Sequence, residues 1–83
     1  MQITFKLFAS LTDYLPPERK GNVVVLEITP ETTVADLIQR YNVPERSAHL
    51  VLINGLFVPP GERASRVLAE GDELAIWPPI AGG

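Results

Sequence analysis

Residues 33–41 read TVADLIQRY, and their spacing predicts an amphipathic helix. Four apolar residues recur at positions i, i+3, i+4 and i+7: Val34, Leu37, Ile38 and Tyr41. This spacing gives a helix of about ten residues one apolar face, which must cover a sheet or another helix. Thr33 and Asp36 can form a capping box at its start, and Asn42 suits a left-handed C-terminal end.

Strand patterns flank this helix on both sides. Residues 3–7 alternate between apolar and polar side chains, and residues 23–28 are β-branched and apolar apart from Glu27. Between these two segments, residues 10–13 resemble a capping box for a short helix, which Pro16 and Pro17 end. The sequence therefore predicts a strand, a short helix and a second strand before the main helix.

A hairpin and a last strand follow the main helix. The apolar runs 50–53 and 56–58 flank Asn54-Gly55, a dipeptide that favours a type I′ turn because both of its residues accept positive φ. Residues 73–77 form the final strand, in which Leu74 and Ile76 share a face. Runs of strands around one long helix predict an α+β fold whose helix covers one face of the sheet and leaves the other open.

Composition excludes several classes of function. Seven Lys and Arg against ten Asp and Glu give a net charge of −3, and the basic residues do not cluster, so no nucleic-acid partner is expected. The absence of cysteine excludes disulfides, thiolate metal sites and a cysteine nucleophile. No apolar run is long enough to span a membrane, and the first residues alternate rather than forming a signal peptide. A small domain of this kind fits the cytoplasm.

Enzyme motifs are also missing. The chain has no glycine-rich phosphate loop and no HExxH motif. The single histidine, His49, could pair with a serine in a hydrolytic triad, but an imidazole at the start of a strand is more often a surface residue. Glu70, Asp72 and Glu73 could hold a cation, but their place in a turn favours a solvated corner. We expect no catalytic residue, no metal and no resident cofactor.

The last six residues contain two prolines and two glycines, which exclude a central strand: Pro78, Pro79, Ile80, Ala81, Gly82 and Gly83. One interpretation is a frayed end, since chain termini are commonly disordered. The prolines nevertheless stiffen the base of the segment, and six extended residues reach about 20 Å. We therefore expect a flexible tail, residues 78–83, that can carry its terminal carboxylate into a partner's site.

Two terminal glycines suit covalent chemistry at that carboxylate. Without side chains, they can thread a narrow channel and approach a nucleotide closely. A carboxylate is a poor electrophile until it is activated, for example as an acyl adenylate. Because the chain has no cysteine, any sulfur that it carried covalently would sit on the carboxylate of Gly83.

Together these segments resemble the MoaD/ThiS family of ubiquitin-like sulfur carriers. The ending WPPIAGG (77–83) is similar to that of molybdopterin synthase small subunits, and EGDEL (70–74) precedes it at the family's spacing. LFASL (7–11) and TVADL (33–37) match the family's first strand–helix junction and main helix start. The resemblance implies a β-grasp fold over residues 1–77, with a mixed sheet of about four or five strands covered on one face by one main helix.

The same resemblance implies a function. An E1-like enzyme of the MoeB/ThiF type would adenylate Gly83, and a sulfur donor would convert it to a thiocarboxylate. In the molybdopterin branch, which Pro78-Pro79 favours, the tail enters a MoaE-type large subunit of molybdopterin synthase. ThiS-like carriers for thiamine thiazole synthesis, tungsten-cofactor carriers and tRNA-thiolation carriers are alternatives. So are a ubiquitin-like modifier that is conjugated to lysines and a binding module with an incidental tail.

Alternation also predicts a docking surface. It places Trp77 on the face of the last strand opposite Leu74 and Ile76, near the open face of the sheet and beside the tail. Tryptophan is a common interface hot spot, although it can equally pack over its own sheet. The remaining candidates for this partner-docking surface are Phe8, Leu56, Phe57 and Val58.

Overall fold

The computed structural model describes residues 1–79. Its strands form one sheet in the order β2-β1-β5-β3-β4. The elements are β1 (Gln2–Leu7), the 3₁₀ helix η1 (Ala9–Tyr14), β2 (Val23–Glu27), α1 (Val34–Arg40), η2 (Glu45–Ser47), β3 (Leu50–Ile53), β4 (Leu56–Phe57), η3 (Pro60–Glu62) and β5 (Glu73–Trp77). No helix among these elements is long and apolar enough to cross a membrane.

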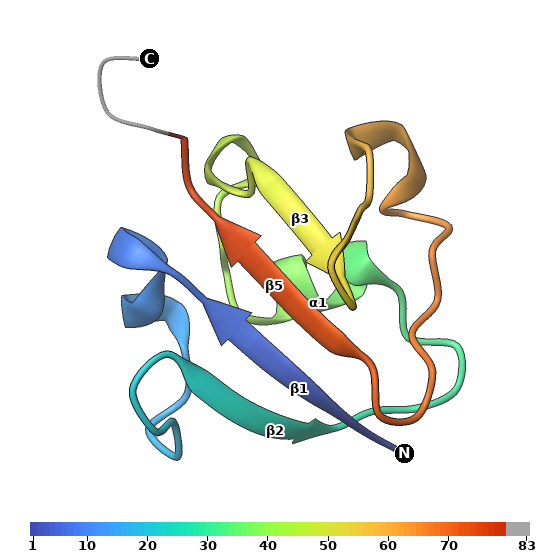
Figure 1. The fold of residues 1–83 in the computed structure, drawn as a ribbon, viewed down its shortest axis with the longest axis horizontal. Coiled ribbons are helices and arrows are strands. Elements are labelled where there is room, and N and C mark those ends of the chain that lie inside the picture. Colours follow the sequence, from blue (N-terminus) through green and yellow to red (C-terminus); the bar gives the residue numbers. More distant parts are fainter. Residues whose placement is uncertain (80–83) are drawn as a thin grey trace.

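The sheet is mixed because its two central strands run parallel. β1 pairs with β5 from Thr4 opposite Glu73 to Leu7 opposite Ile76, whereas β1–β2, β3–β4 and β3–β5 are antiparallel. Figure 1 shows β1 and β5 side by side and pointing the same way, with α1 crossing behind the sheet. The predicted α+β fold of the β-grasp type, a mixed sheet with one main helix, is confirmed.

Strand alternation places the core between the sheet and α1. The core-facing residues of β1, β3 and β5 are at most 1% exposed: Ile3, Phe5, Leu7, Val51, Ile53, Leu74 and Ile76. Val34, Leu37 and Ile38 of α1 are buried against them, as the helical spacing predicts. Because the alternate residues of the same strands point away from α1, the sheet keeps a second, open face.

The capping box of α1 is present. The Asp36 amide donates to Thr33 Oγ1 over 3.1 Å, and the Thr33 amide donates to Asp36 Oδ2 over 2.9 Å. The helix is shorter than the predicted ten residues because Asn42 adopts φ of 61° and ends it. Tyr41 forms the C-cap, and its ring lies 5.5 Å from that of Phe5. The main helix therefore begins and ends through its own local sequence.

Removing the cap hydroxyl should destabilise the domain measurably. We expect Thr33→Ala to lower the free energy of unfolding by about 1 kcal/mol, because the Asp36 amide loses its acceptor. Urea denaturation followed by circular dichroism measures this loss. Gln39→Ala, at an exposed position of the same helix, is the control and should change stability little. Equal stability of Thr33→Ala and the parent chain would contradict a stabilising role of the Thr33 hydroxyl as the helix cap.

The predicted helix after β1 takes a different form. Residues 9–14 form a 3₁₀ helix whose N-cap is Phe8, without a side-chain cap. Ser10 lies inside this helix and not at its extended N-cap position, so the predicted capping box at residues 10–13 is wrong. The reason is a sharp turn after β1, in which Ala9 adopts φ of 52° and its carbonyl accepts the Thr12 hydroxyl over 2.7 Å.

The predicted hairpin is confirmed. Asn54 and Gly55 have φ of 51° and 84°, as a turn of type I′ requires at both central positions. The Asn54 side chain links the turn to β5, because its Oδ1 accepts the Glu73 amide over 2.9 Å. The turn therefore sets the register of β3, β4 and β5.

Candidate functional site

The candidate site lies where β5 ends and residues 78–83 begin. Trp77 is the last residue of β5, between the end of β1 and the start of β3. On one side, the Phe8 amide donates to the Ile76 carbonyl over 3.1 Å. On the other side, the His49 amide donates to the Trp77 carbonyl, also over 3.1 Å. The backbone at the start of the predicted tail is thus held from both sides.

Two aromatic rings stack at this point. The rings of Phe8 and Trp77 are nearly parallel, at 8°, with centroids 4.0 Å apart. Both side chains are half-buried. The indole of Trp77 therefore packs over its own sheet against Phe8 and keeps part of its surface exposed, and its role in docking stays a prediction.

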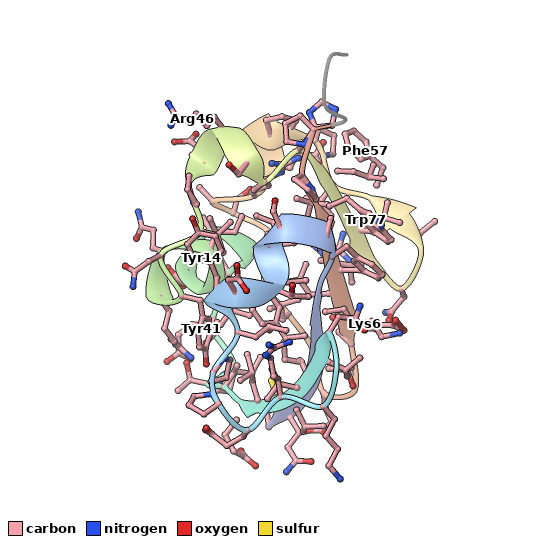
Figure 2. The ribbon with its side chains drawn as sticks, turned by 90° about the vertical axis from the view of Figure 1, so that its left-hand side faces the viewer. Lys6, Tyr14, Tyr41, Arg46, Phe57 and Trp77 are labelled. Carbon is pink, nitrogen blue, oxygen red and sulfur yellow. The ribbon has the colours of Figure 1, made fainter. Side chains whose placement is uncertain are left out.

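Apolar side chains continue from this stack across the open face. Leu50 is paired with Trp77, and Leu52 is paired with Phe57; paired residues point to the same face. We call this surface the open-face patch: Phe8, Leu50, Leu52, Phe57 and Trp77. Phe57 is 54% exposed, which is unusual for a phenylalanine. In Figure 2, Phe57 and Trp77 lie on the side of the molecule opposite Tyr41.

Two predicted members of the docking surface do not belong to this patch. Val58 is 2% exposed, and its amide donates to the Val51 carbonyl, so its side chain lies in the core. Leu56 is 69% exposed but is paired with Ile53, which places it on the α1 side of the sheet. Sequence reasoning missed Leu50 and Leu52, although their alternation with Val51 and Ile53 indicated that they share a face.

An ion pair borders the patch. Lys6 lies opposite Ala75 in the central strand pair, and its Nζ contacts a carboxylate oxygen of Glu73. Figure 2 places Lys6 on the same side of the molecule as Trp77. The open face thus combines an apolar surface with a charged border, which is the usual composition of a protein interface.

The three carboxylates singled out in the sequence stabilise the turn before β5. Glu70 accepts the Gln2 amide, and Asp72 accepts the Ala69 amide and the Asn54 side-chain amide, all within 2.9 Å. Glu73 pairs with Lys6. Within residues 1–79, no group of three His, Cys, Asp or Glu side chains is arranged to hold a metal.

His49 lines a groove on the α1 side of the sheet. The groove has a volume of about 930 Å³ and lies between α1, η2 and η3. No serine is among its lining residues, so nothing here supports a hydrolytic triad on His49. The buried Arg63 also lines it, and burial lowers the pKa of its guanidinium while the nearby Glu45 carboxylate raises it.

The predicted tail residues are only partly described. Pro78 is half-buried and Pro79 is exposed. Ile80, Ala81, Gly82 and Gly83 lie outside the described residues. The division into a domain of residues 1–77 and a tail of residues 78–83 therefore stays a prediction.

Comparison with family models gives a match to the ThiS family over residues 6–83. The chain belongs to the ThiS family. The match includes the main helix, the hairpin, the open-face patch and Gly82-Gly83. Proteins of this family are small ubiquitin-like carriers. No match was found among curated protein sequences.

Solved structures with this fold include a modifier and a complex of two molybdopterin-converting factor subunits. SAMP1 from Haloferax volcanii is 27% identical, with full coverage of both chains and a TM-score of 0.66. A second structure, of small archaeal modifier protein 1 from Haloferax volcanii, is 26% identical to this chain. The match covers 95% of this chain and 98% of the modifier, also with a TM-score of 0.66. The complex of subunits 1 and 2 of the molybdopterin-converting factor from Helicobacter pylori shares the fold at 15% identity, with full coverage and a TM-score of 0.62.

Proposed function

We propose that this chain is a sulfur carrier that reacts at the carboxylate of Gly83. An E1-like enzyme of the MoeB/ThiF type binds the chain and ATP; a Gly83 carboxylate oxygen attacks the α-phosphate, and pyrophosphate leaves. A hydrosulfide ion from the sulfur donor then attacks the acyl carbon, AMP leaves with that oxygen, and a thiocarboxylate and a proton remain. The observation that carries this proposal is the family match through Gly82-Gly83, in the segment that follows the tethered end of β5.

The composition of the chain supports this chemistry. No cysteine is present, so no thiol side chain can carry persulfide or thioester sulfur. In this mechanism the chain supplies the acceptor carboxylate and a docking surface, and its partners supply the catalytic side chains. Pro78, Pro79, Ile80, Ala81 and Gly82 form the segment that enters the partner's site, where glycine leaves room for close approach.

We assign the carrier to molybdopterin synthesis. The two prolines before the Gly-Gly ending support this pathway, and so does the shared fold of the Helicobacter pylori molybdopterin-converting factor complex. The second partner is then a MoaE-type large subunit, which accepts the tail so that the sulfur passes to the pterin precursor. The same carrier chemistry has three alternative destinations for the sulfur: thiamine thiazole synthesis, tungsten-cofactor synthesis and tRNA thiolation.

Intact-mass analysis tests the carrier function. The chain is incubated with an E1-like enzyme, ATP and a sulfur donor, and its mass is measured before and after the reaction. We expect the mass gain of one oxygen-to-sulfur exchange, and a chain with a C-terminal amide on Gly83 as control should show none. An unchanged mass, although the enzyme thiolates its own carrier in a parallel reaction, would exclude the proposal.

A protein modifier is the second candidate function. The observation that favours it is the similarity to small archaeal modifier protein 1 over the whole chain. In this function a lysine amine of another protein attacks the acyl carbon of the same adenylate, AMP leaves, and an isopeptide bond forms. C-terminal fragments of this chain that end in Gly82-Gly83 and are joined to lysines of other proteins in digests of cell extracts would support conjugation, whereas thiocarboxylate on the free chain supports the carrier.

The open-face patch should contribute most of the partner affinity. We expect Trp77→Ala to weaken binding to the E1-like enzyme by about thirtyfold, which corresponds to roughly 2 kcal/mol for a central hot spot. Calorimetric titration measures the Kd. Phe57→Ala tests the same patch at an edge strand, where the fold depends less on the side chain. Tyr14→Ala, on another side of the molecule, is the control, and unchanged binding by both patch variants would refute the assignment.

A further inference from the structure

Arg63 is a buried cation that follows η3. Its side chain is 7% exposed, and its Nε and Nη2 donate over 3.1 Å to the carbonyls of Val58 and His49. Its Nη1 donates to the carbonyl of Ala48. Within residues 1–79 no ion pair includes Arg63, and the acceptors of its side-chain hydrogen bonds are backbone carbonyls. The guanidinium stays protonated, because its ordinary pKa lies far above neutral pH.

The position of this charge requires an explanation. Burying an ionised group is unfavourable unless it is fully hydrogen-bonded, and a hydrophobic side chain would fill the same volume without that penalty. A planar guanidinium, however, fixes several acceptors in one geometry. Arg63 therefore fixes how the chain before β3 lies against the chain after β4.

One of the three carbonyls that Arg63 binds, that of His49, belongs to a β-bulge opposite the end of β5. Leu50 is paired with Trp77, and the His49 amide also donates to the Trp77 carbonyl over 3.1 Å. His49, directly before β3, and Leu50, the first residue of β3, thus both oppose Trp77, and two residues opposite one is the arrangement of a bulge. Bulges redirect a strand or end its pairing, and here the pairing of β5 ends at Pro78, which has no amide donor.

We infer that Arg63 is a positioning residue for the C-terminal tail. It holds the His49 carbonyl, the His49 amide holds the Trp77 carbonyl, and Trp77 is the residue from which residues 78–83 depart. Arg63 does not touch the reacting carboxylate in this arrangement. The effect of Arg63 on adenylation rests on the proposed function, whereas its effect on the geometry of the bulge does not.

Two substitutions separate the hydrogen bonds of Arg63 from its volume. Arg63→Met keeps an unbranched side chain but removes every donor, and Arg63→Lys keeps the charge and part of the donor capacity. Arg66→Met is the matched control, because it removes the same charge at an exposed position three residues away. Ile28→Val, in the core at the far edge of the sheet, is the control for a general loss of stability.

The first measurement needs no partner. Amide hydrogen exchange at His49, and the near-ultraviolet circular dichroism of Trp77, the only tryptophan, report on the bulge and the ring stack. We expect Arg63→Met to speed exchange at His49 by about tenfold or more relative to core amides of β1, and Arg63→Lys to restore part of the protection. Exchange and dichroism that match those of Ile28→Val would overturn the inference.

The second measurement follows adenylation by ATP–pyrophosphate exchange with an E1-like enzyme, at a temperature where every variant is folded. We expect Arg63→Met to lower kcat roughly ten- to a hundredfold with KM nearly unchanged, because misplacement of a reacting group slows the chemical step while the open-face patch still docks. A rise in KM alone, or an equal effect of Ile28→Val, would contradict a positioning role. If the parent chain itself is not adenylated, the result counts against the proposed function. The amide hydrogen exchange of His49 then decides whether Arg63 holds the bulge.

Discussion

Deleting Gly83, or adding one alanine after it, should abolish adenylation. In a chain that ends at Gly83, either change moves the carboxylate by one residue, about 3.5 Å along an extended tail. A displacement of about 1 Å already slows an enzymatic reaction by up to a hundredfold, so we expect a loss of at least about a thousandfold. ATP–pyrophosphate exchange with the E1-like enzyme measures this rate.

The loss should occur without a loss of the fold. Residues 1–79 contain the complete sheet and core, so both variants should keep the thermal stability of the parent chain and bind the enzyme through the open-face patch. A chain of unchanged length with a C-terminal amide on Gly83 distinguishes loss of the reacting carboxylate from a change in tail length. This chain reaches the active site but lacks the carboxylate oxygen that attacks ATP. Full activity of the extended chain would contradict the proposed reaction at Gly83.

Local signals in the sequence were sufficient to predict the ends of the main helix and the hairpin turn. The capping box of Thr33 and Asp36, the left-handed Asn42 and the Asn54-Gly55 turn all act within a few residues of themselves. Their geometry therefore does not depend on the rest of the fold. These elements, with the alternation of β1 and β5, sufficed for the α+β class and for the covered and open faces of the sheet.

The candidate site depends on pairing over a long distance in the sequence. The parallel pairing of β1 with β5 brings Phe8 against Trp77, and no local pattern predicts that pairing. Resemblance to a family, rather than periodicity, supplied the β-grasp topology. Side chains alternate within the hairpin, so Leu56 and Val58 cannot share a face with Phe57, and the predicted docking surface was wrong to name all three.

Arg63 could not be found from the sequence. An arginine between Glu62 and Ala64 in a loop rich in proline and glycine is typical of a solvated side chain. Its burial follows from the meeting of three segments: the chain before β3, the chain after β4 and η3. Only the folded structure brings these carbonyls to one point, so the bulge at the end of β5 was also absent from the predicted site.

Truncating Phe5 should have the largest effect on stability. Its side chain is fully buried at the centre of β1, where the strand pairs with β2 on one side and β5 on the other. Its ring also contacts that of Tyr41 at the end of α1, so one side chain joins the sheet to the helix. We expect Phe5→Ala to lower the free energy of unfolding by about 3–5 kcal/mol through lost burial and the remaining cavity.

Urea denaturation of Phe5→Ala and Phe57→Ala measures this effect with the same chemical change at two sites. Phe57 is 54% exposed on an edge strand, so its truncation should cost less than about 1 kcal/mol. A domain of this size is stable by about 4–12 kcal/mol, so Phe5→Ala would remove much of that margin. Because the pairing of β1 with β5 also holds Phe8 against Trp77, partial unfolding of Phe5→Ala would remove the docking surface as well. Equal losses at the two positions would show that the core between α1 and the sheet does not stabilise this domain.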